Sequence, residues 1–405
     1  MNRIDQTRKA LIDKSKVVTD SLTWLNFQDF FSPEIESYRK ELRKELEEKV
    51  ASLIPDLVEK AEFPDKALPI LREMKIGEKY CSEPYGKGKN LRFLYAIILE
   101  LARIDASLAT MVLVQLILLG NTIDDFGSDE QKAKLLPKIL NFEIIGGWGL
   151  TERDIGSDAS SLKTTCRQLE NGKWAINGNK RWIGNANKDI MVVFAREEKS
   201  KQVKGFILTL TSKGVTRNAI KHKMALRPVQ NMDIQFDNVE IEEQWRLPKV
   251  VDFTSVAKML AHSRICVAML ACGIGIGIYD NVVKYLSNRS QFNKSLLNFQ
   301  LIQEKLVRIM GNVQASLNLI GKLVELGEKG QNTIGKYALT KAWVTLRIRE
   351  AAALAREMLG GNGIIHDNYA IKAMMDMEAI YTYEGTYDIN SLVAGRELTG
   401  LAAFK

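Results

Sequence analysis

Strand-patterned sequence occupies the middle of an otherwise helical chain, from about residue 146 to about residue 250. It contains four short β-prone runs and turn dipeptides such as Asn171-Gly172 and Asn177-Gly178. The runs are Trp174-Ala175-Ile176, 190–195, 206–210 and 233–236. Because these strands do not alternate with helices, a doubly wound parallel sheet is disfavoured and a small antiparallel β domain is expected.

Helical patterning lies on both sides of this region. The stretch 94–119 is apolar nearly all round and predicts a core helix. Earlier in the chain, Leu42, Leu46, Val50 and Leu53 follow helical spacing among charged residues, which predicts a surface helix. Near the other end, apolar residues keep three- and four-residue steps for about seven turns, which requires partner helices from this chain or from another subunit. These positions are Phe299, Ile302, Leu306, Ile309, Val313, Leu317, Ile320 and Val324.

Length and charge limit the classes of function. The chain has 405 residues, 46% of them hydrophobic, and this size favours three regions at 1–145, 146–250 and 251–405. The net charge of +8 suits anionic ligands, but the basic residues are dispersed among acids, which disfavours nucleic-acid binding. The cysteines show no CxxC spacing, so neither a metal site nor a disulfide is expected; they are Cys81, Cys166, Cys266 and Cys272.

Neither a membrane span nor an export signal is expected. The longest uncharged window, 106–123, approaches spanning length, but its polar residues and its missing basic flank favour a buried helix. The N-terminal stretch mixes bases such as Arg3 with acids such as Asp5 and lacks the apolar run of a secretory signal. The ending Leu401-Ala402-Ala403-Phe404-Lys405 is not an SKL-type peroxisomal address, and the compartment stays open between peroxisome, mitochondrion and cytoplasm.

Several motifs have both a structural and a functional interpretation. Gly273-Ile274-Gly275-Ile276-Gly277 lies in helical sequence, which indicates close helix packing and not dinucleotide binding. The segment 146–158 is either a linker with capping residues or a loop that hydrogen-bonds a polar ring. Trp182 either packs in the core or forms a wall for a flat ring. The glycines of 360–363 either end a helix or let backbone amides approach a pyrophosphate.

The most informative motif is Tyr383-Glu384-Gly385-Thr386. Aromatic and aliphatic neighbours would bury the Glu384 carboxyl and raise its pKa toward the range of a general base. Gly385 would let another molecule approach the backbone closely. The alternative is the start of a last helix, with Gly385 and Thr386 as its cap.

In their order and spacing these motifs resemble the acyl-CoA dehydrogenase and acyl-CoA oxidase superfamily over nearly the whole chain. The matching segments are 149–158, 182–185, 289–300, 359–363 and 383–386. The ending from Gly395 to Phe404 resembles most the plant short-chain peroxisomal acyl-CoA oxidases and, more distantly, glutaryl-CoA dehydrogenases.

This resemblance implies a mainly α fold with a central β domain. Its parts would be an N-terminal α-helical domain, a middle antiparallel β-barrel-like domain and a C-terminal four-helix bundle, assembled as a homotetramer. FAD would lie between the β domain and the C-terminal helices, partly across a subunit interface. The residues implied to bind it are Trp148, Leu150, Thr151, Ser157, Trp182, Gly184, Arg289, Phe292, Gln300, Glu357, Gly360, Gly361, Thr386 and Asp388.

The resemblance also implies the reaction, the conversion of a short- to medium-chain acyl-CoA to trans-2-enoyl-CoA. Glu384 would remove the α proton and flavin N5 would take the β hydride, with electrons passed to O2 or to an electron-transfer flavoprotein. Hydrogen bonds to the thioester oxygen would act like an oxyanion hole. Ser157, Arg264 and Gly385 are implied to meet the acyl-CoA, although a packing ion pair is an equal alternative for Arg264.

Three positions depart from the family pattern. Gly184 stands where dehydrogenases commonly carry Thr or Ser, which leans slightly toward O2 as acceptor. Asn293 replaces a glycine after Phe292, which puts the geometry of that turn in doubt. Ala109 stands where glutaryl-CoA dehydrogenases place an Arg, and no Lys or Arg lies between Arg103 and Lys132, which favours an apolar acyl tail.

Two alternatives stay open. One is a glutaryl-CoA dehydrogenase-like enzyme. The other is a non-catalytic FAD-binding assembly member of the same fold, which the intact Glu384 argues against. His262 and His366 are expected to be structural or exposed, because nothing pairs them with a nucleophile.

Overall fold

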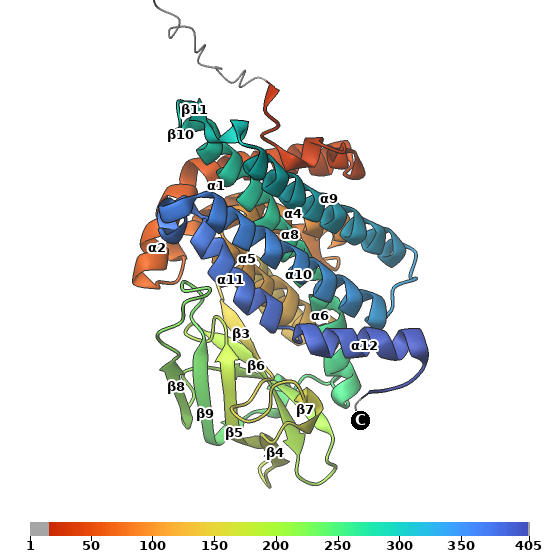
Figure 1. Cartoon of the computed structure of the whole chain (residues 1–405). Helices are drawn as coiled ribbons and strands as arrows, with labels where there is room; N and C mark the ends of the chain where they lie inside the picture. Colours follow the sequence, from red (N-terminus) through yellow and green to blue (C-terminus); the bar gives the residue numbers. More distant parts are fainter. Residues whose placement is uncertain (1–15, 404–405) are drawn as a thin grey trace, which may run out of the picture.

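The computed structural model describes residues 16–403 as a body of helices with a β-sheet domain against one end (Figure 1). The three regions follow one another as the patterning predicted. The N-terminal residues considered above for a secretory signal, and the last two residues of the ending, lie outside the described residues.

The N-terminal region is helical. Its first long helix, α1, begins after Ser32, whose hydroxyl accepts the Ile35 N–H at 3.4 Å, and it ends at Lys49, so the predicted positions Val50 and Leu53 follow the helix. The elements are η2 (Ser21–Thr23), η3 (Phe27–Phe30), α1 (Pro33–Lys49), η4 (Ala51–Leu53), α2 (Ile54–Lys60), η5 (Asp65–Ala67), α3 (Leu68–Glu73), η6 (Gly77–Lys79), β1 (Tyr80–Cys81), β2 (Gly88–Lys89), α4 (Leu91–Ile104), α5 (Ala106–Leu113), η7 (Val114–Gly120), α6 (Asn121–Phe126) and α7 (Asp129–Leu140).

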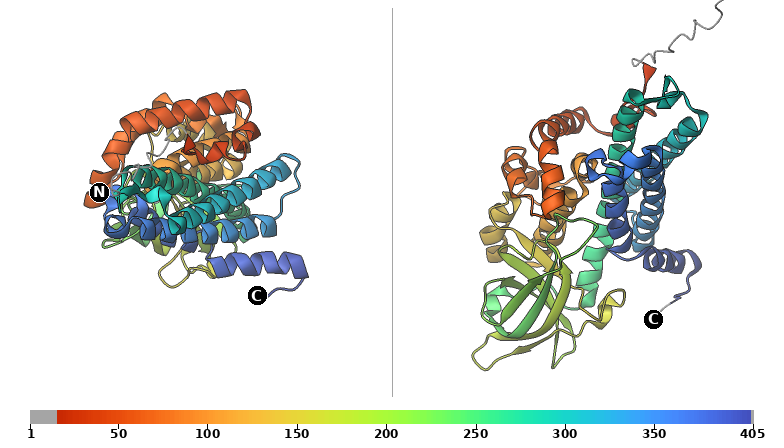
Figure 2. Two further views of the ribbon diagram at one scale, coloured as in Figure 1. Left: turned by 45° about the horizontal axis from the view of Figure 1, so that its top comes forward. Right: turned by 60° about the vertical axis from the view of Figure 1, so that its left-hand side comes forward.

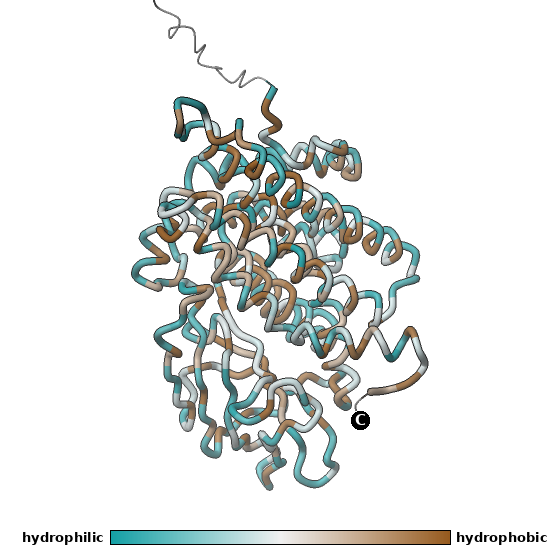
Figure 3. Tube along the Cα trace, viewed as in Figure 1, coloured by the Kyte–Doolittle hydropathy of each residue, from teal (hydrophilic) through white to brown (hydrophobic). Residues whose placement is uncertain are grey.

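The buried helix predicted for 106–123 is confirmed, but the core helix predicted over 94–119 is two helices, α4 and a helix that begins at Ala106, separated at the extended residue Asp105. Helix α5, the π-helical segment η7 and α6 form one continuous helix, Ala106–Phe126, which is long and apolar enough to cross a membrane but is 89% buried within the structure over its most apolar stretch. The second helix of this kind, Phe253–Asn288, is buried to the same 89%. Apolar segments gather in the middle of the helical body (Figure 3). Both helices therefore belong to the protein core.

The middle region forms a seven-stranded sheet in the order β3-β6-β4-β5-β9-β8, with β7 paired to β6. The strands curl around a small core of their own (Figure 2, right). Most pairs are antiparallel, but β3 and β4 pair parallel to β6, which the patterning did not predict. The elements are β3 (Gly146–Gly149), η8 (Ala159–Ser161), β4 (Thr165–Gln168), β5 (Trp174–Ile183), β6 (Ile190–Glu197), β7 (Val203–Thr209), β8 (Val215–Ala219), β9 (Met232–Ile241) and η9 (Glu243–Trp245).

One of the two predicted turns is wrong. Asn171-Gly172 forms the turn between β4 and β5, with the Gly172 N–H donating to the Leu169 carbonyl at 3.0 Å. Asn177-Gly178 instead lies inside β5, where Gly178 has φ 138° and marks a register shift against β9. A side chain at Gly178 would come within 2.7 Å of the Thr164 Cα, so the glycine serves close packing at a bulge.

The C-terminal region contains four packed helices, α8 to α11, and a further helix, α12, that crosses the lower end of α10 (Figure 1). The apolar stripe predicted along α9 is buried within the chain from Ile309 to Val324, so its partners are helices of the same subunit. The elements are α8 (Phe253–Asn288), β10 (Ser290–Gln291), β11 (Lys294–Ser295), η10 (Leu296–Asn298), α9 (Gln300–Glu328), α10 (Ile334–Met358), η11 (Gly360–Ile364), η12 (His366–Asn368), α11 (Ala370–Thr382) and α12 (Tyr387–Thr399).

The glycines of α8 allow close helix packing, as predicted. A Cβ at Gly273 would lie 2.7 Å from the Leu99 carbonyl oxygen, and one at Gly275 would lie 2.7 Å from the Ile348 Cδ1. Helix α8 therefore packs against α4 and α10 at a distance that larger residues would prevent. All four cysteines are buried and free, and residues 16–403 contain no cluster of His, Cys, Asp or Glu that could hold a metal ion.

Candidate active site

A left-handed turn between α11 and α12 presents Glu384. Glu384 has φ 55° and Gly385 has φ 83°, so the chain reverses direction directly after the end of α11. Thr386 begins α12 and accepts the Ile389 N–H at 3.2 Å through its side chain. The capping interpretation of the motif is therefore correct for Thr386. A non-glycine residue at positive φ costs free energy, so the surrounding contacts must hold Glu384 there.

Two residues of α8 lie against the Glu384 carboxylate. The Ser263 hydroxyl donates a hydrogen bond to Oε2, and Arg264 attracts the carboxylate electrostatically. Burial raises the pKa of Glu384, and these two groups, with Lys341, oppose that rise only in part. A carboxyl with a raised pKa is suited to removing a proton near neutral pH.

Arg264 is buried, with 9% of its surface exposed, yet its guanidinium makes no hydrogen bond within residues 16–403. It forms no ion pair in that range either, so the packing ion pair considered above is absent from this part of the chain. Burial lowers the pKa of Arg264, against the attraction of Glu384. A buried, unpartnered guanidinium is costly unless a bound group completes its hydrogen bonds.

One turn of the central helix joins the turn that carries Glu384 to the β domain. The Thr110 hydroxyl lies 3.3 Å from the Tyr383 hydroxyl, and the Met111 carbonyl accepts the Asn185 side-chain N–H at 3.1 Å. The residues after β5 and the turn that carries Glu384 therefore contact the same short stretch of α5. This brings the predicted residues Trp182 and Gly184 to the neighbourhood of Glu384.

Trp182 is not a core residue. It has φ 66°, and 50% of its surface is exposed beside Arg181, whose guanidinium lies 5.2 Å from the indole centroid. Gly184 is buried, but the nearest atoms to a side chain there would lie 3.5 Å away, on Val229. The turn thus presents an open aromatic face next to a backbone stretch without a side chain.

The loop after β3 is anchored by a buried ion pair. Glu152 accepts hydrogen bonds from the Lys163 and Thr164 N–H groups at 2.7 and 2.9 Å and from Lys180 Nζ at 2.9 Å. Lys180 also donates to the Leu150 carbonyl at 3.0 Å, and burial lowers the pKa of Lys180 to about 8. Glu152 is therefore a structural anchor that shapes the loop.

Four predicted ligand positions lie on β3 and on this loop, and one of them, Leu150, is buried. The Thr151 side chain is half-buried and has no hydrogen bond to residues 16–403, and Ser157 is exposed. Trp148 is buried, and its indole N–H donates to the Thr122 hydroxyl at 3.0 Å. A ligand contact from Trp148 would therefore use its backbone.

Asp388 is exposed on α12, whereas six further predicted cofactor residues gather at the opposite end of the helical body. We call them the end cluster: Arg289, Phe292, Gln300, Glu357, Gly360 and Gly361. All six are exposed, Phe292 to 87%. Asn362 ties the glycine turn to α8 by donating to the Tyr285 hydroxyl at 2.8 Å. Because the β10–β11 hairpin lies far from the sheet (Figure 1), one chain does not bring the end cluster and Trp182 together.

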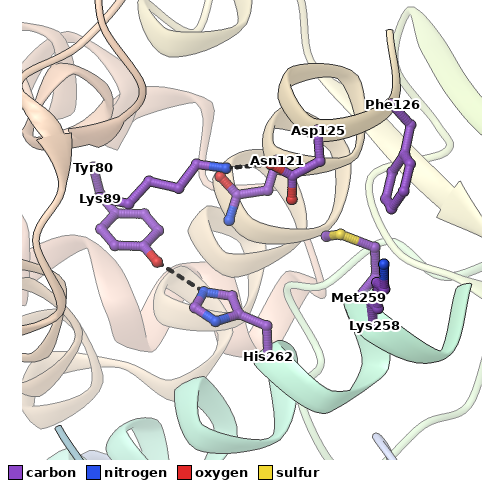
Figure 4. Close-up of a pocket in the computed structure, with 8 residues that line it drawn as sticks. All are labelled: Tyr80, Lys89, Asn121, Asp125, Phe126, Lys258, Met259 and His262. Carbon is purple, nitrogen blue, oxygen red and sulfur yellow. Dashed lines mark hydrogen bonds and ion pairs between the residues drawn. The ribbon is translucent and has the colours of Figure 1, made fainter. Parts of the chain in front are cut away.

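A separate cavity of about 330 Å³ lies beside α6 and the first part of α8 (Figure 4). His262 lines it and hydrogen-bonds the Tyr80 hydroxyl at 2.9 Å, and burial lowers the pKa of His262 to about 4. His262 directly precedes Ser263 on α8. Because successive helical residues point about 100° apart, His262 faces this cavity whereas Ser263 faces Glu384. The cavity is lined by Tyr80, Lys89, Asn121, Asp125, Phe126, Lys258, Met259 and His262, none of which was a predicted site residue.

Comparisons with known proteins cover all three regions. Models of the N-terminal, middle and C-terminal domains of acyl-CoA dehydrogenase match residues 32–143, 147–239 and 253–399. The short-chain specific acyl-CoA dehydrogenase of Megasphaera elsdenii is 30% identical over 362 residues, which is 87% of this chain and 94% of the relative.

Solved structures agree with the sequence comparisons. A glutaryl-CoA dehydrogenase from Mycobacterium smegmatis superposes with a TM-score of 0.89 at 28% identity over 95% of this chain and 100% of its own. A glutaryl-CoA dehydrogenase from the same species in complex with FADH2 gives 0.91 at 26% identity, again over 95% and 100%.

The fold and the matches define an FAD-dependent oxidoreductase that acts on the CH–CH bond of acyl-CoA. The chain belongs to the acyl-CoA dehydrogenase family. The residues present fit FAD. Trp182 offers an exposed aromatic face for a flat ring, and the Thr151 hydroxyl is unpaired within residues 16–403. At Gly360 and Gly361 nothing would lie within 4 Å of an added side chain, so a ligand can reach the backbone amides.

Proposed function

We propose that Glu384 is the general base that removes the α proton of a short- to medium-chain acyl-CoA, giving trans-2-enoyl-CoA. The observation that carries this proposal is the placement of a carboxyl with a raised pKa on a left-handed turn, hydrogen-bonded by Ser263 and adjacent to the unpartnered Arg264. The non-catalytic alternative does not account for a left-handed backbone conformation at a carboxyl whose pKa is raised.

Bound FAD supplies the acceptor for the β hydride. In this proposal Trp182 and Gly184 lie along the flavin, Leu150, Thr151 and Ser157 contact it from the β3 loop, and Thr386 and Asp388 contact it from the start of α12. The residues of this chain then orient the acyl-CoA and exclude water from Glu384. Arg264 completes its hydrogen bonds with the bound acyl-CoA, and the Gly385 backbone admits the thioester.

We infer that the enzyme is a homo-oligomer, with a tetramer as the family expectation. The end cluster supports this inference, because its six residues are exposed at the end of the helical body that carries the β10–β11 hairpin, away from the sheet (Figure 1). A second chain would bring its end cluster to the cofactor of the first. The apolar ring of Phe292 is 87% exposed, so burying this one residue against a second chain would already remove a large apolar surface from water.

The acyl tail is proposed to be apolar. Ala109 is buried on α5, and the segment from Ile104 to Gln131 contributes no Lys or Arg to the core. A distal carboxylate of a glutaryl group would lack a cation there. The similarity to glutaryl-CoA dehydrogenases keeps that substrate as the second candidate.

We propose two alternative electron acceptors, an electron-transfer flavoprotein or O2. An electron-transfer flavoprotein is supported by the relative from Megasphaera elsdenii, which is a dehydrogenase. O2 is supported by Gly184, which leaves the flavin without the hydroxyl that dehydrogenases commonly place there.

An anaerobic experiment tests the reaction and then the acceptor. The FAD-loaded protein is mixed with butyryl-, octanoyl-, palmitoyl- and glutaryl-CoA, and flavin absorbance is followed. Rapid bleaching with butyryl- or octanoyl-CoA is expected, and bleaching by none of the four would contradict the proposed function. Adding O2 or an electron-transfer flavoprotein then shows which reoxidises the flavin.

The Glu384→Gln variant tests the base. It should bind acyl-CoA with similar affinity but bleach at least about 10²-fold more slowly, because general-base catalysis typically contributes 10² to 10⁴. Bleaching at the wild-type rate would exclude Glu384 as the base.

A further inference from the structure

Lys341 is a fully buried lysine close to the catalytic turn. It lies in the middle of α10, and none of its surface is exposed. Its ammonium donates to the Tyr381 carbonyl at 2.9 Å and to the Gly385 carbonyl at 2.7 Å. Within residues 16–403 it forms no ion pair shorter than 4.0 Å. A buried ammonium without a carboxylate partner is unusual and suggests a function for the charge.

Asn390 contacts the same turn from the other side. It is fully buried on α12, and its side-chain N–H group donates to the Gly385 carbonyl at 2.7 Å, to the Thr386 carbonyl at 3.1 Å and to the Glu384 carbonyl at 3.3 Å. Lys341 and Asn390 therefore share the Gly385 carbonyl. Together they fix the carbonyl groups on both sides of Glu384.

We propose that Lys341 and Asn390 are positioning residues that hold Glu384 in its left-handed conformation, and that the Lys341 charge keeps the half-buried Glu384 carboxylate ionised. The inference rests on the proposed role of Glu384. Neither residue has to touch substrate or FAD. Lys341 acts through the backbone of the turn and through its electric field.

The groups that face Glu384 support this role. Arg264 and Lys341 are its cations, Ser263 is its hydrogen-bond donor, and Cys266 and Tyr383 are nearby neutral groups. Burial raises the pKa of Glu384, whereas Ser263, Arg264 and Lys341 lower it. Burial and Arg264 in turn lower the pKa of Lys341 to about 7. The positive charge of Lys341 therefore acts mainly below neutral pH, where Glu384 must resist protonation.

Two substitutions separate the charge from the hydrogen bonds. Lys341→Gln keeps two N–H donors and removes the charge, whereas Lys341→Met removes both. Lys336→Met is the matched control, because Lys336 lies on the same helix and donates to one carbonyl, that of Gln331, but is exposed. If Lys341 only fills space, Lys341→Met should leave the titration of Glu384 unchanged.

The direct readout is the protonation of Glu384 in the FAD-loaded protein, followed by infrared spectroscopy of the carboxyl C=O band as the pH is varied. The band is assigned by subtracting the spectrum of Glu384→Gln. Removing the positive charge of Lys341 from the surroundings of the half-buried carboxylate should raise the midpoint by about one to two pH units in both Lys341 variants. An unchanged midpoint would overturn the charge role, and Lys336→Met should not move it.

Kinetics complete the test. Lys341→Met should lower the rate of flavin bleaching by about tenfold or more with little change in KM, and Lys341→Gln should lose less, because it retains donors for the turn. Asn390→Ala provides an independent variant should either lysine variant not fold. It should slow bleaching without moving the midpoint, and a wild-type rate would overturn the positioning role. Failure of the proposed function can be told apart from failure of this inference, because the flavin of Glu384→Gln itself would then bleach at the wild-type rate.

Discussion

The ammonium of Lys372 lies 2.5 Å from the Asp105 Oδ2, and this contact joins α11 to the start of α5. The same ammonium lies 2.5 Å from the Asp376 Oδ2, and Asp376 accepts the Leu226 N–H at 2.6 Å. Leu226 belongs to the loop before β9. One buried cation therefore links the N-terminal helices, the C-terminal helices and the β domain.

Lys372→Met should destabilise the protein strongly. It would leave two carboxylates buried without a cation, and breaking a buried ion pair typically costs about 3–5 kcal/mol. Urea unfolding at pH 7 measures the change in free energy of unfolding. Lys329→Met, at an exposed lysine after α9, is the control and should change stability by less than about 0.5 kcal/mol. A similar stability for both variants would contradict the importance of this link.

Ser263→Ala should shift the pH dependence of flavin bleaching. The Ser263 hydrogen bond stabilises the Glu384 carboxylate, so its loss raises the pKa of Glu384 further. On acidification, the bleaching rate of the variant should therefore fall at a pH about one unit higher than that of the wild type. Stopped-flow rates between pH 5 and 9 measure the shift. Ser287→Ala removes a hydroxyl farther along α8 that bonds only the Val283 carbonyl, and its profile should match the wild type.

His262 should make stability depend on pH. Its folded-state pKa is about 4, and that of an unfolded histidine is about 6.5, so between these values only the unfolded state takes up the proton. Stability from this group is complete above about pH 6.5 and is lost as the pH falls toward 4, by about 3 kcal/mol. Between pH 7.0 and 4.5, the free energy of unfolding measured in urea should fall less for His262→Gln than for the wild type. An equal loss would show that His262 does not carry the effect.

Gly277→Ala should destabilise α8. A Cβ there would lie 2.5 Å from the Tyr369 hydroxyl oxygen and closer still to the Arg103 carbonyl oxygen, so α8 and α4 would have to separate. A loss of about 1–3 kcal/mol is expected from thermal or urea unfolding. Gly311→Ala on α9 is the matched control, because nothing lies within 4 Å of its added Cβ and alanine favours the helix. A loss at both positions would exclude close packing as the cause.

Features with a local pattern could be predicted from the sequence. The strands around 190–195 and 206–210, the core helix and the tight packing at Gly273 each follow from a few neighbouring residues. Strand β3 could not be predicted in the same way. Its Gly146-Gly147-Trp148-Gly149 sequence has little strand propensity, and pairing with β6 holds it in the sheet.

The same distinction between local sequence patterns and long-range packing applies to the residues of the candidate site. Glu384 could be singled out as a candidate base because its carboxylate, glycine and aromatic neighbours are consecutive in the sequence, and its role stays a prediction. Lys341 was missed, because a lysine within a helix normally indicates a solvated face and only the packing of α10 against the turn buries it. Glu152 was placed in a candidate ligand loop, but its partner Lys180 shows that it anchors that loop.

The contact of Asn390 with the catalytic turn makes the order of synthesis matter. The strand that carries Trp182 and the helix that carries Ser263 leave the ribosome well before α12, yet Glu384 obtains its last restraints only when α12 docks. A nascent chain therefore builds the surroundings of Glu384 first and restrains the Glu384 turn last. Translation that stalls before α12 would yield a polypeptide with most of its core but without the hydrogen bonds from Asn390 that restrain the Glu384 turn.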